Sequence, residues 1–287
     1  MRLFAISFIS VLVVIIALFI ARIWGLNQQF TPYDHPLLTK SGVVYGAVVH
    51  STDEIEQLSR IKSEAWAVVP VRMSSDKKFY VLTNKQTSDF IDFLEKKQRE
   101  NPSQPIFRSN KIHEYSTEEL KQFFATLVTL EDLYKTFPQQ VFAISLQDNA
   151  SEIHAHLAKL LEPYQADQRT VILSDTHVLL TSVKEQKPQW LYGSSRADIT
   201  RLLSFESVGI LPATPFKADI LTTPLSYQNR PLLKGEIVEE ISRRKKITII
   251  TDLLSEDFEL AKGLGVKGYF FFTLEEFAKS LDQHPAP

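Results

Sequence analysis

The chain has 287 residues, of which 32 are Lys or Arg and 34 are Asp or Glu, and it contains no cysteine. This near balance, with no basic run longer than the four residues Arg243–Lys246, excludes the electrostatic surface that nucleic-acid binding requires. The lack of cysteine fits a bacterial envelope protein that avoids stray disulfides, and it also fits many cytosolic proteins.

The first segment in chain order is strongly apolar. Residues 3–21 carry no charge, and serines are their only polar side chains. As a helix rising 1.5 Å per residue, this run spans about 28 Å, which matches a hydrocarbon core of about 30 Å. A cleaved signal peptide has a shorter apolar run with small residues at its exit, whereas this run leads into Arg22, Ile23 and Trp24. We therefore predict a transmembrane anchor over residues 1–24, with a signal peptide and a buried core helix as the alternatives.

The charges that flank this run predict its orientation. The terminal amine and Arg2 precede it and Arg22 follows it, which favours a cytoplasmic N-terminus and an external main domain. We expect a single-pass protein of the bacterial inner membrane with its main domain on the periplasmic side. Residues 25–41 are polar and have no periodicity, so they are expected to form a stalk between the anchor and a domain over residues 42–287.

Short apolar runs alternate with amphipathic helical patterns along the rest of the chain. This alternation predicts a parallel sheet covered by helices, and about 250 residues is the usual length of a TIM-type (β/α)8 barrel. An open doubly wound sheet is the alternative, although no glycine-rich dinucleotide or phosphate loop supports it. Nine runs qualify as strands, one more than an eight-stranded barrel needs. Either the sixth or the seventh run is therefore expected to be an extra piece outside the barrel. The nine are Val43–Val49, Ala65–Val71, Phe79–Leu82, Val141–Leu146, Thr170–Leu173, Trp190–Tyr192, Ala218–Leu221, Ile247–Ile250 and Gly268–Phe272.

Several motifs resemble the glycerophosphodiester phosphodiesterase family. Thr117–Leu120 and Val128–Leu133 match, in order and spacing, the family's "T-x-E-E-L" helix start and its "P-T-L-E-E-L-L" segment. Ala65–Asp76 is similar to the family's second strand with the "T-K-D-G" turn, and Phe79–Asn84 to its third strand. Gly263–Phe270 resembles the last strand, so the resemblance covers about residues 43–281.

The resemblance implies metal-assisted hydrolysis of a phosphodiester, with Ca²⁺ or Mg²⁺ held by carboxylates and two histidines acting as base and acid. The implied positions carry other residues here. The Glu-x-Asp pair falls on Val68–Pro70, the His-Asp pair on Thr83–Asn84, and the Glu-x-Lys motif on Ser145–Gln147. The His-Arg-Gly opening falls within Val44–Val48, and the closing Thr-Asp falls near Phe271–Phe272. We expect no metal, no cofactor and no inherited catalysis.

Other polar residues follow the predicted strands and could form a site at the barrel mouth. Asp175 and His177 come after the fifth strand and could form an acid–base pair or half a metal site, or simply begin a helix. Thr251 and Asp252 follow the eighth candidate strand directly. His50 follows the first strand and is either a remnant of the family's base or part of a helix cap.

The segment that follows Tyr192 is the candidate ligand-binding site. Free N–H groups, two hydroxyls and a guanidinium at a helix start suit an anion such as a phosphate head group. An ordinary serine cap is the alternative. The residues are Ser194, Ser195 and Arg196.

Three functions remain open from the sequence. The first is a catalytically degenerate barrel at the membrane that binds a phospholipid-derived or phosphorylated ligand, or an envelope protein. The second is an active phosphoric diester hydrolase of glycerophospholipid metabolism with a rebuilt site. The third is a structural envelope protein without a small ligand. The loss of all the implied catalytic residues favours the first.

Overall fold

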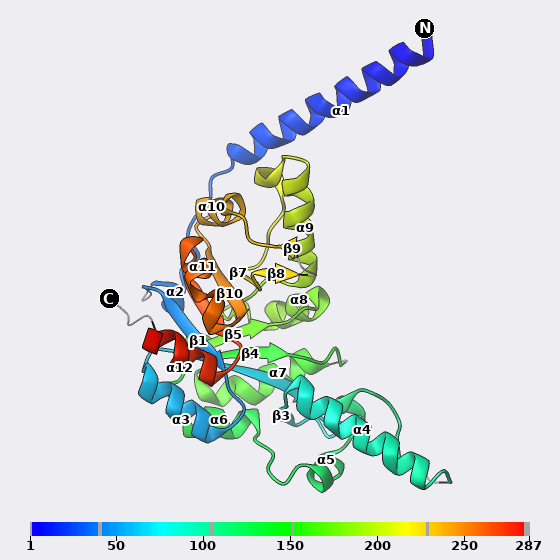
Figure 1. Ribbon diagram of the computed structural model, residues 1–287, viewed down its shortest axis with the longest axis vertical. Helices are drawn as coiled ribbons and strands as arrows, with labels where there is room; N and C mark the ends of the chain where they lie inside the picture. Colours follow the sequence, from blue (N-terminus) through cyan, green and yellow to red (C-terminus); the bar gives the residue numbers. More distant parts are fainter. Residues whose placement is uncertain (1, 40–41, 104–105, 151, 228–229, 284–287) are drawn as a thin grey trace.

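The computed structural model describes residues 2–39, 42–103, 106–150, 152–227 and 230–283 (Figure 1). In these residues, eight parallel strands form one sheet in the order β6-β5-β4-β2-β1-β11-β10-β7. Continuously apolar sequences such as that of β4 form these strands because both faces of a parallel sheet are buried. The strands are β1 (Val44–Val48), β2 (Trp66–Met73), β4 (Phe142–Leu146), β5 (Thr170–Leu173), β6 (Leu191–Tyr192), β7 (Ile220–Thr223), β10 (Ile247–Leu253) and β11 (Gly268–Phe271).

Helices cover the outside of the sheet, and Figure 1 shows them around the strands. Several begin with a side-chain cap, such as α5, where Ser116 and Glu119 form a capping box. The helices are α3 (Thr52–Ile61), α4 (Asn84–Glu100), α5 (Thr117–Phe123), α6 (Leu130–Thr136), α7 (Ile153–Leu161), α8 (His177–Gln186), α9 (Arg196–Ser207), α10 (Gly235–Arg243), α11 (Phe258–Gly263) and α12 (Leu274–Gln283). A small hairpin, β8 (Ser226–Tyr227) and β9 (Arg230–Pro231), follows β7.

The sheet is nearly closed between β6 and β7. The N–H of Asp219 donates to the carbonyl of Tyr192 at 2.9 Å, and the hydroxyl of Ser194 donates to the carbonyl of Thr222 at 2.7 Å. The predicted (β/α)8 barrel is therefore confirmed, and the alternative of an open doubly wound sheet is wrong.

The extra strand is not the one expected. Both the sixth and seventh candidate strands belong to the barrel, as β6 and β7. The extra strand is β3 (Phe79–Val81), which pairs antiparallel with the end of β2. Only five residues, Ser74–Lys78, join the two strands, with Lys77 at a φ of 64°. A link this short makes a hairpin and cannot cross over to a parallel position.

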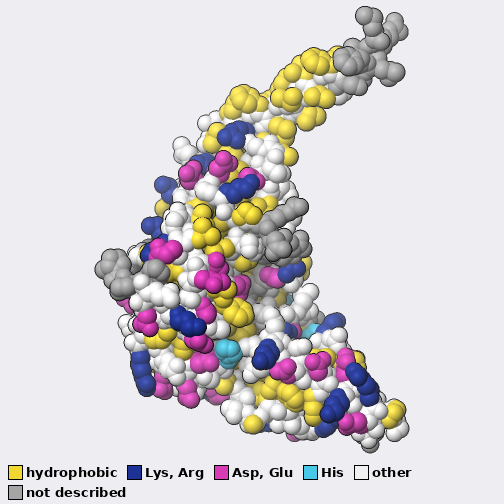
Figure 2. Space-filling model, viewed as in Figure 1, with side chains coloured by type: hydrophobic (Ala, Val, Ile, Leu, Met, Phe, Trp, Pro, Cys, Tyr) yellow, Lys and Arg dark blue, Asp and Glu magenta, His cyan; other side chains and the backbone are white. Residues whose placement is uncertain are grey.

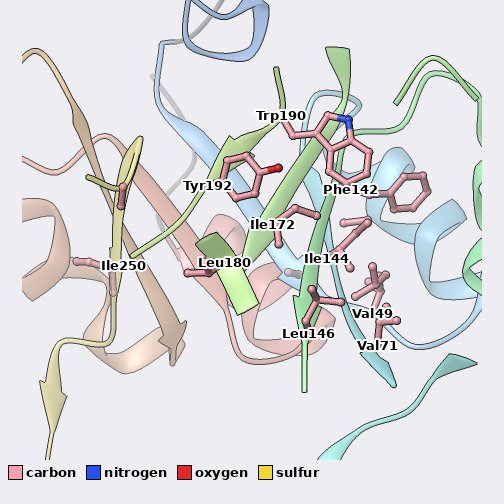
Figure 3. Close-up of a cluster of buried hydrophobic side chains, with 14 of the residues drawn as sticks. Val49, Val71, Phe142, Ile144, Leu146, Ile172, Leu180, Trp190, Tyr192 and Ile250 are labelled. Carbon is pink, nitrogen blue, oxygen red and sulfur yellow. The ribbon is translucent and has the colours of Figure 1, made fainter. Parts of the chain in front are cut away.

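Two apolar layers hold the barrel together. Inside it, Trp66 on β2 and Phe270 on β11 meet with ring centroids 5.8 Å apart, and Gly46 leaves room for the Phe270 ring. Outside it, side chains of the opposite alternation pack between the strands and the helices, as Figure 3 shows for Phe142, Ile172 and neighbouring residues. The interior of the barrel is thus a packed core, as in other barrels of this size.

The N-terminal helix α1 (Arg2–Leu26) projects from the barrel (Figure 1). Its part Phe8–Leu26 has a mean hydropathy of 2.6 and is almost fully exposed, so it is long and apolar enough to cross a membrane. Hydrophobic side chains cover it in the space-filling view (Figure 2).

The segment after α1 differs from the expected stalk. Within the described residues 27–39, Tyr33, Leu37 and Leu38 pack against the inner apolar cluster of the barrel, and His35 is buried. The short helix α2 (Pro36–Thr39) lies in this segment. The apolar residues of this segment are too few and too scattered to give a periodic pattern in the sequence. They are nevertheless enough to cover one end of the barrel.

Candidate functional site

The ends of β2 and β4 are the part of the mouth to which the resemblance assigns the cation ligands. Val68 lies in the inner apolar cluster of the barrel, and Pro70 stands opposite Ser145 in the β2–β4 register. The amide of Gln147 donates to the hydroxyl of Ser145 at 2.6 Å. Valine and proline side chains offer no donor atom to a divalent cation, so this strand pair does not fit one.

A buried ion pair lies just beyond these positions. Arg72 Nη1 donates to Asp148 Oδ1 at 2.5 Å, and Arg72 Nη2 donates to Asn84 Oδ1 at 2.8 Å. The side chains of Arg72 and Asp148 are only 11% and 6% exposed. Burial raises the pKa of Asp148, and the charges of Arg72 and His113 oppose this rise. Arg72 therefore gives Asp148 a partner that would compete with any metal.

The sequence interpretation missed this pair. A signal was present, because Arg72 continues the alternation of Trp66 and Val68 on the inward face of β2 and is therefore a charge at an inward position. Its partner could not be found from the sequence, since Asp148 lies 76 residues away.

Asp175 and Arg196 come together at the ends of β5 and β6. Arg196 Nη2 lies 2.5 Å from Asp175 Oδ2, and the two side chains are 60% and 75% exposed. Ser194 is turned away from this surface, because its N–H and hydroxyl both bond to Thr222. Of the predicted anion ligands, Arg196 is thus accessible but paired, and Ser194 takes part in closing the barrel.

His177 lies beside the start of α9. Its Nδ1 is 3.4 Å from Ser195 Oγ and 3.7 Å from Asp198 Oδ2. The Ser195 hydroxyl donates to Asp198 Oδ2 at 2.6 Å, and the two residues form a capping box for α9. Ser195 therefore serves as a helix cap, and its hydroxyl proton points to Asp198 rather than to His177.

A small cavity of about 40 Å³ opens between α8 and the start of α9. Three of its lining residues, His177, Lys184 and Lys217, can carry positive charge. Lys184 is held by Asp219 at 2.6 Å, and Asp198 is offset by Arg201 at 3.2 Å. Lys217 is therefore a basic group of the lining beyond the two ion pairs that balance Asp219 and the lining residue Asp198.

His50 belongs to a separate group. Its Nδ1 lies 2.8 Å from Glu54 Oε2, and its N–H donates to the same oxygen at 2.7 Å. The hydrogen bond from the His50 side chain is the main reason why the pKa of Glu54 is lowered. In the described residues, no hydrogen bond or ion pair links His50 to Asp175 or His177, so the structure does not bring the three catalytic candidates together.

Thr251 and Asp252, expected after the strand, lie inside its last residues, because β10 runs to Leu253. Asp252 adds a second carboxylate near Asp175. Its backbone is left-handed, with a φ of 54°. Neighbouring atoms shield its carboxylate, although part of the residue stays exposed, and this desolvation raises its pKa. The negative charge of Asp175 raises it further. Among the described residues, no three His, Asp or Glu side chains converge as a metal site would need.

Comparisons with known proteins identify the architecture. Neither a protein-family description nor a curated protein matches the sequence. Among solved structures, the chain is similar to the glycerophosphoryl diester phosphodiesterase domain of a Mycobacterium tuberculosis protein, with a TM-score of 0.59 and 13% identity over 90% of this chain and 100% of that one.

A glycerophosphodiester phosphodiesterase from Parabacteroides distasonis gives a TM-score of 0.58 at 12% identity, covering 86% of this chain and 100% of that one. A glycerophosphodiester phosphodiesterase from Agrobacterium tumefaciens gives a TM-score of 0.55 at 13% identity, covering 83% of this chain and 99% of that one. At such low identity the likeness concerns the fold and not the chemistry. The chain has the barrel fold of glycerophosphodiester phosphodiesterases.

Proposed function

We propose that this protein is a membrane-anchored barrel that binds a phosphate-bearing, phospholipid-derived ligand and does not hydrolyse phosphodiesters. The observation that carries the proposal is the β2–β4 strand pair. It presents Val68, Pro70 and Ser145 where the resemblance implies cation ligands, and the nearby carboxylate of Asp148 is already paired with Arg72. Without carboxylates to hold a cation, the charge of a phosphodiester under attack would not be neutralised.

Hydrolysis is tested directly on the purified full-length chain in detergent. Glycerophosphocholine and glycerophosphoethanolamine are incubated with the protein and millimolar Ca²⁺ or Mg²⁺, and glycerol 3-phosphate is measured. We expect no release above the protein-free control. Metal-dependent release that scales with protein concentration would sink the non-catalytic proposal.

The ligand site that we propose is the surface around Arg196 and the neighbouring basic cavity. The Asp175–Arg196 pair is exposed on both sides, and exposed pairs contribute only about 0–1 kcal/mol. A phosphate can therefore replace Asp175 as the partner of Arg196. Lys217 adds positive charge in the neighbouring cavity, which is also lined by His177 and by Lys184, the partner of Asp219.

Binding is tested by calorimetric titration with glycerol 3-phosphate and with inorganic phosphate. Arg196→Ala is expected to weaken binding of both at least several-fold. Arg99→Ala is the matched control, because Arg99 is 79% exposed on α4 and also forms a surface pair, with Glu95. Equal affinity in the wild type and in Arg196→Ala would remove Arg196 from the site.

The location that we propose is the bacterial inner membrane, with α1 as the anchor and the barrel in the periplasm. The chain has no cysteine, so a single cysteine placed at the exposed position Val178 reports the side of the membrane without background. An impermeant thiol reagent is expected to label it in cells whose outer membrane has been made permeable. Labelling only after the inner membrane is disrupted would place the barrel in the cytoplasm.

A rebuilt hydrolase is the second candidate, and one observation favours it. The charges of both Arg72 and His113 act on the pKa of buried Asp148. A carboxyl, an imidazole and a guanidinium therefore lie close enough to interact near the mouth. Such a set can move a proton and hold an anion. If any phosphodiester is hydrolysed, this candidate requires that His113→Ala abolish the activity. A structural envelope protein is the remaining interpretation if neither hydrolysis nor phosphate binding is found.

A further inference from the structure

We infer that the loops after α9 and α10 form a surface that rests on the head groups of the bilayer, held there by a rigid junction between α1 and the barrel. The inference rests on the proposed anchoring role of α1. It replaces the expected stalk between the anchor and the barrel with a barrel fixed to the end of its membrane helix.

Direct contacts join the last turns of α1 to the loop after α9. Arg22 Nη1 donates to the carbonyl of Gly209 at 2.6 Å. Gly25 packs on η4 (Leu211–Ala213) so closely that an added Cβ would lie 2.3 Å from the carbonyl carbon of Pro212. Any larger residue at position 25 would force the helix and the barrel apart.

An arginine of the barrel caps the C-terminal end of α1. Arg243, at the end of α10, donates from Nη2 to the carbonyl of Gly25 at 3.1 Å and from Nη1 to that of Gln28 at 3.3 Å. The last carbonyls of a helix lack partners and carry partial negative charge, so a guanidinium is a favourable cap. The same guanidinium lies 5.1 Å from the ring centroid of Phe30, which extends the contact beyond the helix.

The length of the span sets the depth of these contacts. The uncharged run of residues 3–21 comprises 19 residues, or about 28 Å of helix, which fills a hydrocarbon core of about 30 Å and ends just before Arg22. Arg22 and Gly25 are then within one helical turn of the membrane boundary. Gly209 and Pro212, which touch them, must lie at the level of the lipid head groups.

The side chains on this surface suit that level. Val208 is 52% exposed beside Gly209, and Trp24 is 62% exposed on α1. Arg243 and the exposed Lys245 lie at the end of α10 and just after it, and Figure 2 shows Lys and Arg side chains, mixed with Asp and Glu, where α1 meets the barrel. An exposed Val and Trp among charged side chains fit the polar–apolar boundary of a bilayer.

The depth of Val208 is measured by spin labelling of the full-length protein. Val208→Cys carries the nitroxide, because the chain has no other cysteine. The protein is reconstituted in vesicles of phosphatidylcholine and phosphatidylglycerol in equal parts. Val178→Cys, on α8 and 69% exposed, is the matched control. We expect the label at 208 to be relaxed more by oxygen than by a water-soluble nickel chelate, and the label at 178 to show the reverse. Equal exposure of both labels to the chelate would overturn the contact surface.

The junction is tested in the Val208→Cys protein by Arg243→Ala and, independently, by Gly25→Leu. Each is expected to abolish the protection of the label at 208, whereas Arg60→Ala on the distant helix α3 leaves it unchanged. Continued protection in both variants would overturn the role of the junction. Circular dichroism of each variant checks that the barrel is folded. Flotation of the wild type with the vesicles tests anchoring separately, so a chain that fails to float contradicts the proposed anchor and not the junction alone.

Discussion

Arg72 and Asp148 form an ion pair of 2.5 Å between the ends of β2 and β4, with both side chains nearly excluded from water. A carboxylate in this position needs the guanidinium, because burial alone raises its pKa. The pair thus links two neighbouring strands of the barrel at the side of the mouth where the resemblance implies a cation.

Removing one partner of this pair should destabilise the protein strongly. We expect Arg72→Ala to lower the free energy of unfolding by about 3–5 kcal/mol, because it leaves a buried charge without compensation. The double variant Arg72→Met/Asp148→Leu should lose much less of the free energy of unfolding, since neither side chain of the former pair is charged. Urea denaturation followed by circular dichroism measures both. Similar losses in the single and double variants would show that packing, and not charge, holds this site.

The barrel interior should not tolerate a methyl group at Gly46. An added Cβ would lie 2.7 Å from Cδ1 of Phe270 and 2.8 Å from the carbonyl oxygen of Trp66. We expect Gly46→Ala to cost about 1–3 kcal/mol, the usual range for overpacking. Gly235→Ala is the control, because nothing lies within 4 Å of its added Cβ. Thermal unfolding compares the two, and equal melting temperatures would contradict the tight Gly46–Phe270 contact.

Asp76 should make the stability depend on pH in the acid range. Burial by itself raises its pKa, but hydrogen bonds from the hydroxyl and N–H of Thr117 outweigh this and lower it from 3.8 to about 2. A carboxylate with a lowered pKa stabilises the fold above its unfolded pKa, and this contribution is lost as the pH falls from about 4 to 2.

The variant Asp76→Asn should remove that part of the pH dependence. Because the Asp76 side chain is 38% exposed, we expect Asp76→Asn to lower the free energy of unfolding at neutral pH by only about 1 kcal/mol. Urea unfolding at several pH values between neutrality and the acid limit measures it. Parallel pH profiles for the wild type and the variant would contradict the assigned role.

Divalent metal should not stabilise the protein. A cation that binds the folded state at a hundredfold excess over its dissociation constant adds about 2.7 kcal/mol. We expect no change in the melting temperature of the full-length chain at millimolar Ca²⁺ or Mg²⁺. Na⁺ at equal ionic strength controls for screening. A metal-specific rise would mean that carboxylates outside the β2–β4 pair bind a cation, and it would favour the rebuilt hydrolase.

The fold could be predicted from the sequence because its signals are local and repeated. Each strand of the barrel is a short apolar run, and the order of the motifs around Thr117–Leu120 and Val128–Leu133 agrees with one topology. The error over β3 arose because an apolar run of three or four residues looks the same in a hairpin and in a parallel strand. Only the length of the link before it, Ser74–Lys78, distinguishes the two.

The candidate site was less predictable because it depends on long-range pairing. The sequence placed Asp175 and Arg196 at strand and helix ends, but it could not show that they pair with each other across 21 residues. It also could not show that Ser194 bonds to Thr222, 28 residues away. Which polar groups are already satisfied is decided by the packing of separate strands, and no local pattern records it.

The incomplete joint between β6 and β7 has a consequence for how the barrel opens locally. Ladders of backbone hydrogen bonds such as the five-residue register of β2 and β4 hold other strand pairs together. Between β6 and β7, one bond between backbone groups joins Asp219 to Tyr192, and the other bonds depend on the side chains of Asp219, Ser194 and Thr222. Opening should begin where the fewest bonds must break together. The amide protons of Ser194 and Asp219 should therefore exchange with solvent sooner than those of β4. The barrel is an eight-stranded sheet whose edge strands, β6 and β7, are joined mainly through side chains, next to the start of the helix that carries Arg196.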